Sequence, residues 1–117
     1  PFFSAASRRM ADVLQPDVQW VGGVTAVVKI CHLAEAAGIA VISHAGMNDA
    51  YGQHVCFAMP NIPWGELFIG SAPGVPLGTT GRRTPGMAVP KEGFLTPSDA
   101  PGFGIEMTRE EIEAAIL

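Results

Sequence analysis

Three polar residues with side chains suited to proton transfer each stand at or near the end of a short apolar run. They are Asp17, His44 and Glu66, and a helical segment separates each from the next. A parallel α/β barrel collects catalytic side chains from the C-terminal ends of different strands, so these three could meet at one place. An imidazole beside two carboxyl groups could form a general acid–base site there.

The apolar runs that carry these residues are predicted to be β-strands. They cover residues 12–16, 39–43 and 63–69, and the first is too short for a helix. The second, 39–43, is rich in branched apolar residues without alternation, which is typical of a strand covered on both faces. We therefore expect three parallel neighbours joined by helical crossovers.

Helices are predicted before each strand. The end of one covers residues 4–11, with Ser4 as its N-cap and two arginines near its last turn. A second opens at Gly22-Gly23 and stops at Gly38, and a third covers about 49–58. The second carries one apolar stripe: Val27, Ile30, Cys31, Ala34 and Ala37.

The remainder of the chain differs in composition. It is dense in Pro and Gly, so we divide the chain into a barrel portion, 1–69, and a loop-rich C-terminal return segment, 70–117. Short strands are predicted at 87–89 and 93–96. Residues 108–111, Thr-Arg-Glu-Glu, form a capping box that leads into a short terminal helix.

The composition excludes several classes of function. Seven basic and eleven acidic residues give a net charge of −4, so the chain lacks the basic stripe of a nucleic-acid-binding protein. No apolar run is long enough to cross a membrane. No secretory leader is visible, and we interpret Cys31 and Cys56 as buried thiols in a cytoplasmic protein. Only 15% of residues are charged, which predicts that the chain buries surface against another part.

Parallel neighbouring strands would place Asp17 beside His44. A carboxylate on one imidazole nitrogen fixes the tautomer and raises the basicity of the other nitrogen, which gives a general base near neutral pH. The alternatives are a turn residue for Asp17, a structural or surface residue for His44, and an exposed acid for Glu66. In the functional interpretation, Glu66 faces charge that develops on a substrate oxygen.

Other residues near the strand ends could line a pocket. We predict this for Trp20, Asn48 and Tyr51, with simple packing as the alternative for Trp20. His32 and His54 lie on helices and are interpreted as structural or surface residues.

Several motifs resemble a known family. Residues 17–25 (DVQWVGGVT), 43–46 (SHAG) and 64–66 (WGE) resemble the C-terminal part of the mandelate racemase subgroup of the enolase superfamily. The tail, at 89–94 and 99–104, is similar to the closing segment of its acid-sugar dehydratases, of which the rhamnonate-like group matches best.

The resemblance implies an α/β fold: the C-terminal part, strands six to eight and a return segment, of a modified (β/α)7β TIM barrel that is incomplete on its own. The rest of the barrel and a capping domain would be its partners, with a homo-oligomer expected. Asp17 and His44 would form a catalytic dyad, and Glu66 would contact the intermediate.

The resemblance also implies a reaction. The carboxylate of a sugar acid would bind Mg²⁺, which stabilises the enediolate formed when the α-proton leaves. Loss of the 3-hydroxyl would then give a 2-keto-3-deoxy acid. The family's metal ligands lie on strands outside this segment, so no residue of this chain is assigned to the metal. A racemase or epimerase of the same superfamily, or a catalytically silent fragment, are the alternatives.

Overall fold

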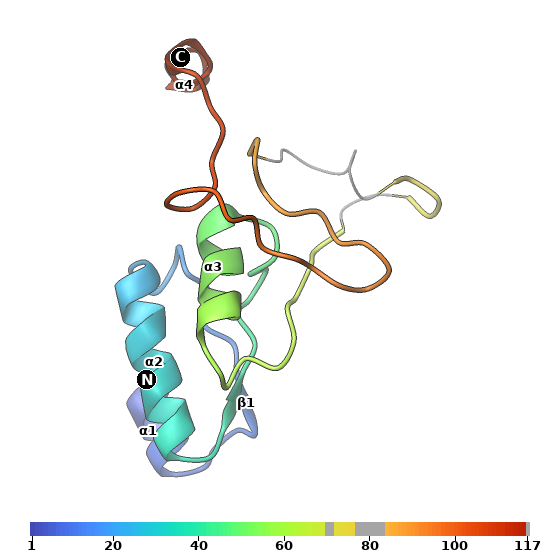
Figure 1. Ribbon diagram of the computed structural model, residues 1–117. Helices are drawn as coiled ribbons and strands as arrows, with labels where there is room; N and C mark the ends of the chain where they lie inside the picture. Colours follow the sequence, from blue (N-terminus) through green and yellow to red (C-terminus); the bar gives the residue numbers. More distant parts are fainter. Residues whose placement is uncertain (70–71, 77–83, 117) are drawn as a thin grey trace. The chain divides into compact units, whose positions relative to one another are not determined.

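The computed structural model describes residues 1–69, 72–76 and 84–116, and it divides into two compact units, Pro1–Phe68 and Ile69–Leu117. The first unit holds most of the regular structure (Figure 1). Its elements, in chain order, are α1 (Phe2–Ser7), β1 (Val13–Leu14), α2 (Val24–Ala36), β2 (Ala40–Val41) and α3 (Ala50–Ala58). The second unit contains α4 (Arg109–Ile116). No helix in the described ranges is long and apolar enough to cross a membrane.

The α2 helix follows the predicted apolar stripe. It starts after Gly23, which has a φ of +92°, a conformation that glycine adopts without steric cost. Four of the five predicted stripe residues are buried: Val27, Ile30, Cys31 and Ala34. The helix contacts α1, α3 and β2, so it forms the centre of the first unit's core.

The prediction for the first helix was wrong at both ends. The α1 helix spans Phe2–Ser7 with Pro1 as N-cap, so Ser4 lies inside it and the two arginines follow it. Arg9 leaves the helical conformation with a φ of +48°. Its guanidinium Nη1 donates to the carbonyl of Ala37 at the end of α2, 3.0 Å away, where a cation offsets the negative end of the helix dipole.

The two strands are parallel and pair Val13 with Ala40 and Leu14 with Val41. They are shorter than predicted because a proline interrupts the pairing. The Ile42 N–H still donates to the Leu14 carbonyl at 3.0 Å, but the reciprocal donor of a parallel ladder would be residue 16. Pro16 has no N–H, so the regular ladder ends there.

The third predicted strand, residues 63–69, is wrong for the same reason. The Val41 N–H donates to the Asn61 carbonyl at 2.9 Å, as a third parallel strand would require. The reciprocal donor would be residue 63, and Pro63 cannot donate. Residues 62–69 therefore run beside β2 without regular strand structure.

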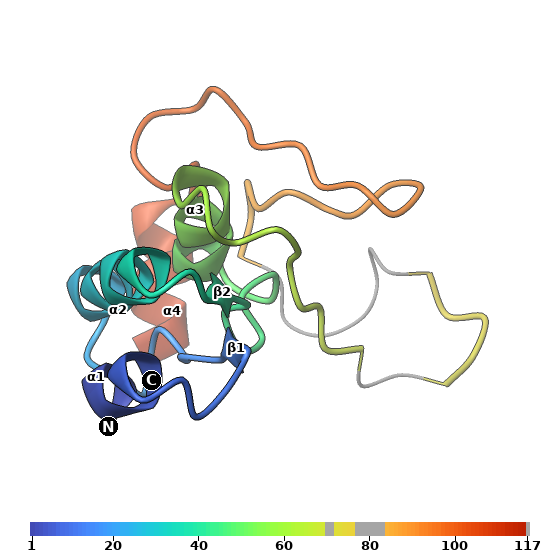
Figure 2. The same cartoon turned by 90° about the horizontal axis from the view of Figure 1, so that it is seen from below.

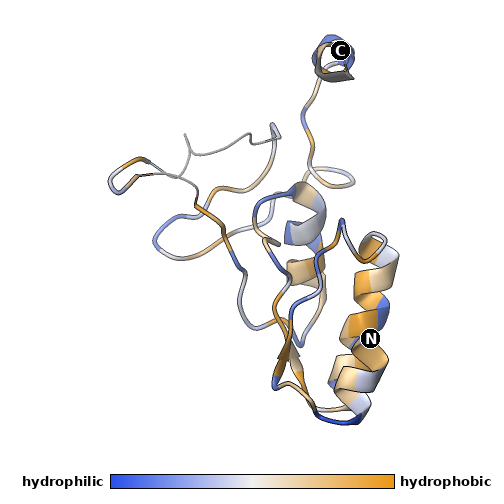
Figure 3. Ribbon diagram, turned by 180° about the vertical axis from the view of Figure 1, so that it is seen from behind, coloured by the Kyte–Doolittle hydropathy of each residue, from blue (hydrophilic) through white to orange (hydrophobic). Residues whose placement is uncertain are grey.

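Successive residues of the strands alternate between two environments. Leu14, Val41 and Ser43 are buried on the face toward the helices, and Figure 2 shows α2 and α3 beside the strand pair. The residues between them, such as Val13, are partly or fully exposed. Figure 3 colours both strands as hydrophobic, and Val13 is 42% exposed on the second face.

In the residues that the structure describes, the second unit contains one short terminal helix after a loop-rich segment. The predicted strands at 87–89 and 93–96 are wrong: in its described residues the only strand-like pairing is an isolated antiparallel bridge between Lys91 and Phe94. The capping box is confirmed. The Glu111 N–H donates to Thr108 Oγ1 at 3.2 Å, and Glu111 Oε2 accepts the Thr108 N–H at 2.8 Å.

Candidate active site

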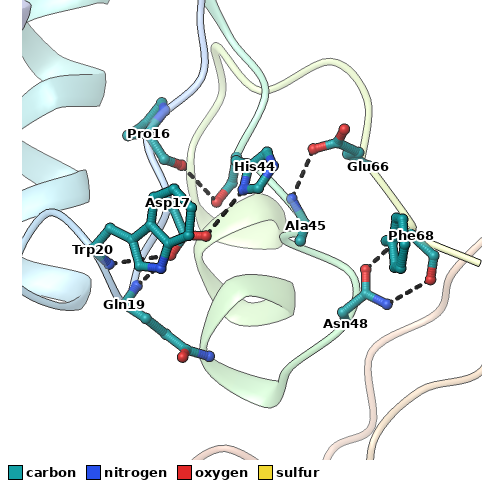
Figure 4. A network of polar contacts seen from close by, with 10 residues as sticks. Pro16, Asp17, Gln19, Trp20, His44, Ala45, Asn48, Glu66 and Phe68 are labelled. Atoms are coloured by element: carbon teal, nitrogen blue, oxygen red, sulfur yellow. Dashed lines mark hydrogen bonds and ion pairs between the residues drawn. The ribbon is translucent and has the colours of Figure 1, made fainter. Parts of the chain in front are cut away.

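Asp17 directly follows Pro16, and its carboxylate uses its two oxygens for different tasks. Oδ1 accepts the backbone N–H groups of Gln19 and Trp20 at 2.8 and 3.1 Å, which closes a turn. Oδ2 lies 3.0 Å from Nδ1 of His44 (Figure 4). The turn and the contact with His44, weighed as alternatives in the sequence, are both present, and the turn orients the carboxylate.

The main chain fixes His44 next to Asp17. The His44 N–H donates to the Pro16 carbonyl at 3.0 Å, and Ser43 Oγ donates to the same oxygen at 3.2 Å. Ser43 is fully buried, so this bond also satisfies its hydroxyl. The side chain of Asp17 is 16% exposed and that of His44 is 46% exposed. The predicted Asp17–His44 contact is therefore confirmed, on the face of the strands that the helices leave open.

The contact shifts the pKa values of both partners in opposite directions. The pKa of His44 is raised above 6.5, first by the hydrogen bond to Asp17 and further by the negative charge of Glu66, while partial desolvation opposes the shift. The pKa of Asp17 is lowered below 3.8, first by the bond with His44 and then by the two backbone N–H groups, again against desolvation. The pair therefore favours an ionised carboxylate that holds the Nδ1 proton of the imidazole.

Glu66 is tied to the loop that follows His44. Its Oε2 accepts the Ala45 N–H at 2.7 Å, and its backbone carbonyl accepts the Met47 N–H at 2.9 Å. Ala45 adopts a φ of +49°, which is unusual for a residue with a Cβ and costs about 1 kcal/mol. Nothing in the sequence marks Ala45, because the contribution comes from its backbone.

Asn48 holds the same segment in place. Its Nδ2 donates to the Phe68 carbonyl at 2.8 Å, and its Oδ1 accepts the Phe68 N–H at 2.7 Å. The side chain thus pairs with the backbone as a neighbouring strand would, where the regular ladder is missing (Figure 4). The sequence suggested a substrate contact for Asn48, whereas this geometry engages both of its polar atoms with Phe68.

The other predicted pocket residues differ in their relation to the dyad. The Trp20 indole lies next to His44, with ring centroids 5.7 Å apart. Tyr51 lies in the first turn of α3, is 43% exposed and takes no part in the described hydrogen bonds of the dyad. His32 is exposed on α2, and His54 packs edge-on against Phe57.

The two cysteines are unsuited to nucleophilic chemistry. Both are free and buried, and desolvation raises the pKa of each thiol to about 11. At neutral pH both remain protonated, and it is the thiolate that reacts or binds a metal. The interpretation of Cys31 and Cys56 as buried thiols is confirmed.

The described residues do not form a metal centre. Residues 1–69, 72–76 and 84–116 contain no group of three or more His, Cys, Asp or Glu side chains that could hold an ion. Glu66 and the dyad alone do not supply the oxygen-rich shell that Mg²⁺ prefers.

Comparison with known proteins shows which family the chain belongs to. Residues 1–112 match the model of the enolase C-terminal domain-like family. The chain belongs to that family. It is 38% identical over 103 residues to a protein of Caldivirga maquilingensis provisionally named L-rhamnonate dehydratase, covering 85% of this chain and 25% of that protein. The predicted relation to the enolase superfamily is confirmed.

Solved structures of the enolase superfamily share the fold. L-rhamnonate dehydratase from Gibberella zeae superposes with a TM-score of 0.75 at 30% identity, over 94% of this chain and 28% of that one. An enolase from Pantoea ananatis, with d-gluconate and Mg bound, gives a TM-score of 0.70 at 21% identity, over 97% and 26%. The chain thus has the α/β fold of these C-terminal domains and spans about a quarter of the length of these relatives.

Proposed function

We propose that these residues belong to a sugar-acid dehydratase and supply its proton-transfer pair. The observation that carries the proposal is the Asp17–His44 contact of 3.0 Å at the ends of two parallel strands. The relatives at 38% and 30% identity are named as L-rhamnonate dehydratases, which favours a rhamnonate-like acid as the substrate.

The chemistry of the pair follows from its hydrogen bonds. Because Asp17 accepts the proton on Nδ1, neutral His44 presents the lone pair of Nε2, which no described hydrogen bond occupies. Nε2 would take the proton from the carbon next to the substrate carboxylate. The imidazolium would then deliver a proton to the departing 3-hydroxyl, so that water leaves and an enol remains. The enol ketonises to a 2-keto-3-deoxy acid.

Glu66 would contact the intermediate, whereas His44 transfers the α-proton. Its Oε2 is fixed by the Ala45 N–H, whereas no described hydrogen bond engages Oε1. We infer that this second oxygen would share a proton with the substrate oxygen on which charge develops. The contribution of Glu66 to the raised pKa of His44 is consistent with its carboxyl lying on the same side of the site.

The proposal assigns Mg²⁺ to the complete enzyme and not to this chain. Mg²⁺ is the metal expected from the family resemblance, but the described residues offer no set of ligands for it. We therefore place the ligands on parts of the relatives' fold that these 117 residues do not span, and the 117 residues alone are expected to be inactive.

The test is turnover by the polypeptide that carries these residues in a complete barrel. Sugar acids, with L-rhamnonate first, would be incubated with Mg²⁺ and the 2-keto product measured. His44→Asn is expected to abolish product formation and the exchange of the α-proton with deuterated solvent. His32→Asn, a matched change at an exposed position of α2, should leave both unchanged. Unchanged turnover in His44→Asn would overturn the assignment.

A further inference from the structure

Trp20 is the most exposed large apolar residue of the described chain, with 82% of its surface accessible, yet its backbone is anchored. Its backbone N–H donates to Oδ1 of Asp17, the carboxylate whose Oδ2 binds His44. The indole and imidazole centroids lie 5.7 Å apart with a tilt of 39° between the planes. One carboxylate therefore binds both the imidazole of His44 and the backbone of Trp20, and the indole lies beside the imidazole (Figure 4).

We propose that Trp20 is a positioning residue for His44, whose imidazole it keeps in one orientation and whose protonated form it stabilises. The proposal rests on the proposed function, in which His44 moves the proton. It assigns Trp20 a role toward His44 itself, separate from any contact with substrate.

The physical basis is the quadrupole of the indole. Aromatic pairs are favourable at centroid distances of about 4.5–7 Å, and a cation within about 6 Å of an aromatic face is attracted to it. The neutral imidazole keeps the aromatic contact but lacks the cation–π attraction, so the contact favours the imidazolium. The charged groups that face His44 in the described structure are the carboxylates of Asp17 and Glu66, and both act in the same direction.

The orientation matters because a single hydrogen bond leaves the ring some freedom. The bond at Nδ1 fixes one atom of the imidazole, while the ring can still rock about that contact. The indole limits this motion from one side. The Trp20 side chain can do so because its own backbone is anchored in the turn made by Asp17.

The experiment is a pH titration, by NMR, of the histidine side chains in these 117 residues. The chain has three histidines, and His44→Gln assigns the resonance of interest. Trp20→Ala should move the His44 midpoint to lower pH and remove the ring-current shift of its carbon-bound protons. Trp20→Phe, which keeps an aromatic face, should lower the midpoint less.

Trp64 provides a matched control, since it is 73% exposed and makes no described ring contact with His44. Trp64→Ala should leave the His44 midpoint unchanged, and unchanged His32 and His54 signals would show that each variant is folded. An unchanged or raised His44 midpoint in Trp20→Ala would overturn the proposal.

Asp17→Asn separates the two proposals. If Asp17→Asn lowers the His44 midpoint while Trp20→Ala does not, the dyad survives and only the role of Trp20 fails. If Asp17→Asn leaves the midpoint unchanged, the dyad itself fails, and the proposed function and the role of Trp20 fail with it.

Discussion

Gly52 in α3 lies against the loop that carries Ala45 and Asn48, and replacing it with alanine should destabilise the first unit. A Cβ at this position would lie 2.8 Å from the Gly46 Cα and 2.9 Å from its carbonyl carbon, and closer still to the carbonyl oxygen. Carbon atoms in contact prefer about 3.5–4.0 Å, so the helix and the loop would have to separate by about 0.7 Å or more.

The expected magnitude follows from two opposing terms. Overpacking a buried position costs about 1–3 kcal/mol, and the upper end applies because the obstructing atoms belong to the backbone. Alanine gains about 0.5–1 kcal/mol over glycine inside a helix. The net loss is about 2 kcal/mol, or roughly 30-fold in the ratio of folded to unfolded chain. Displacement would also stretch the 2.6 Å bond from the Gly52 N–H to Asp49, which caps α3.

Urea unfolding followed by far-UV circular dichroism measures this loss. The α1, α2 and α3 helices all lie in the Pro1–Phe68 unit, so the helical signal reports mainly on the right part of the chain. With a slope of about 1–2 kcal/mol per molar urea, the midpoint should fall by roughly 1–2 M.

Gly65→Ala is the matched control. Its Cβ would meet the side chain of Met47, which has three rotatable bonds and can repack, and Gly65 does not require a positive φ. We expect Gly65→Ala to be distinctly less destabilising than Gly52→Ala. A Gly52→Ala chain that unfolds at the wild-type urea concentration, or at a higher one than Gly65→Ala, would refute the reasoning.

Three further outcomes are expected. Asn48→Ala removes two hydrogen bonds and should cost about 1–2 kcal/mol in the same urea assay, whereas Asn48→Asp, which keeps only the acceptor, should fall between it and wild type. The contact between Asp17 and His44 should stabilise the fold most between pH 3.8 and 6.5. The difference in the free energy of unfolding between wild type and Asp17→Asn should therefore decrease below and above that range. Cys31 and Cys56 should react with a thiol reagent at neutral pH only after urea unfolds the chain.

The sign of the pH dependence follows from the direction of each shift. Because the His44 pKa is raised on folding, its contribution is complete below 6.5 and is lost as the pH rises through the raised value. Because the Asp17 pKa is lowered, its contribution is complete above 3.8 and is lost as the pH falls through the lowered value. A constant difference between wild type and Asp17→Asn from pH 3 to 9 would contradict the dyad. Equal stability of Asn48→Ala and wild type, or fast thiol labelling of the folded chain, would contradict the other two predictions.

The sequence predicted an element correctly where a single periodic pattern of apolar residues specified it. The stripe from Val27 to Ala34 predicted α2, and Asp49 followed by apolar residues and Pro60 predicted α3 closely. The polar residues that follow two neighbouring parallel strands also predicted the Asp17–His44 contact, since such strand ends lie at one edge of the sheet.

The sequence-based predictions failed where backbone hydrogen bonds or backbone conformation determine the structure. The apolar run at 63–69 reads as a strand, but the missing N–H of Pro63 prevents the reciprocal bond to β2. The pairing of Asn48 with Phe68 depends on two segments 20 residues apart, which no local pattern reveals. The role of Ala45 lies in its N–H and its left-handed φ, and its side chain carries no signal for either.

The alternation of the two strands has a consequence for how this protein can change over time. Asp17 and His44 face the open side because each stands an odd number of residues after a buried strand residue, Leu14 or Val41. Insertion or deletion of one residue between Leu14 and Asp17 would turn the Asp17 side chain toward the helices, and the same change between Val41 and His44 would turn the His44 side chain. Either change would separate the pair, whichever residue were added. A change in the length of either stretch would therefore have to come in steps of two to keep both side chains on the open face. The pair thus depends on the number of residues between the core and the dyad as well as on their identity.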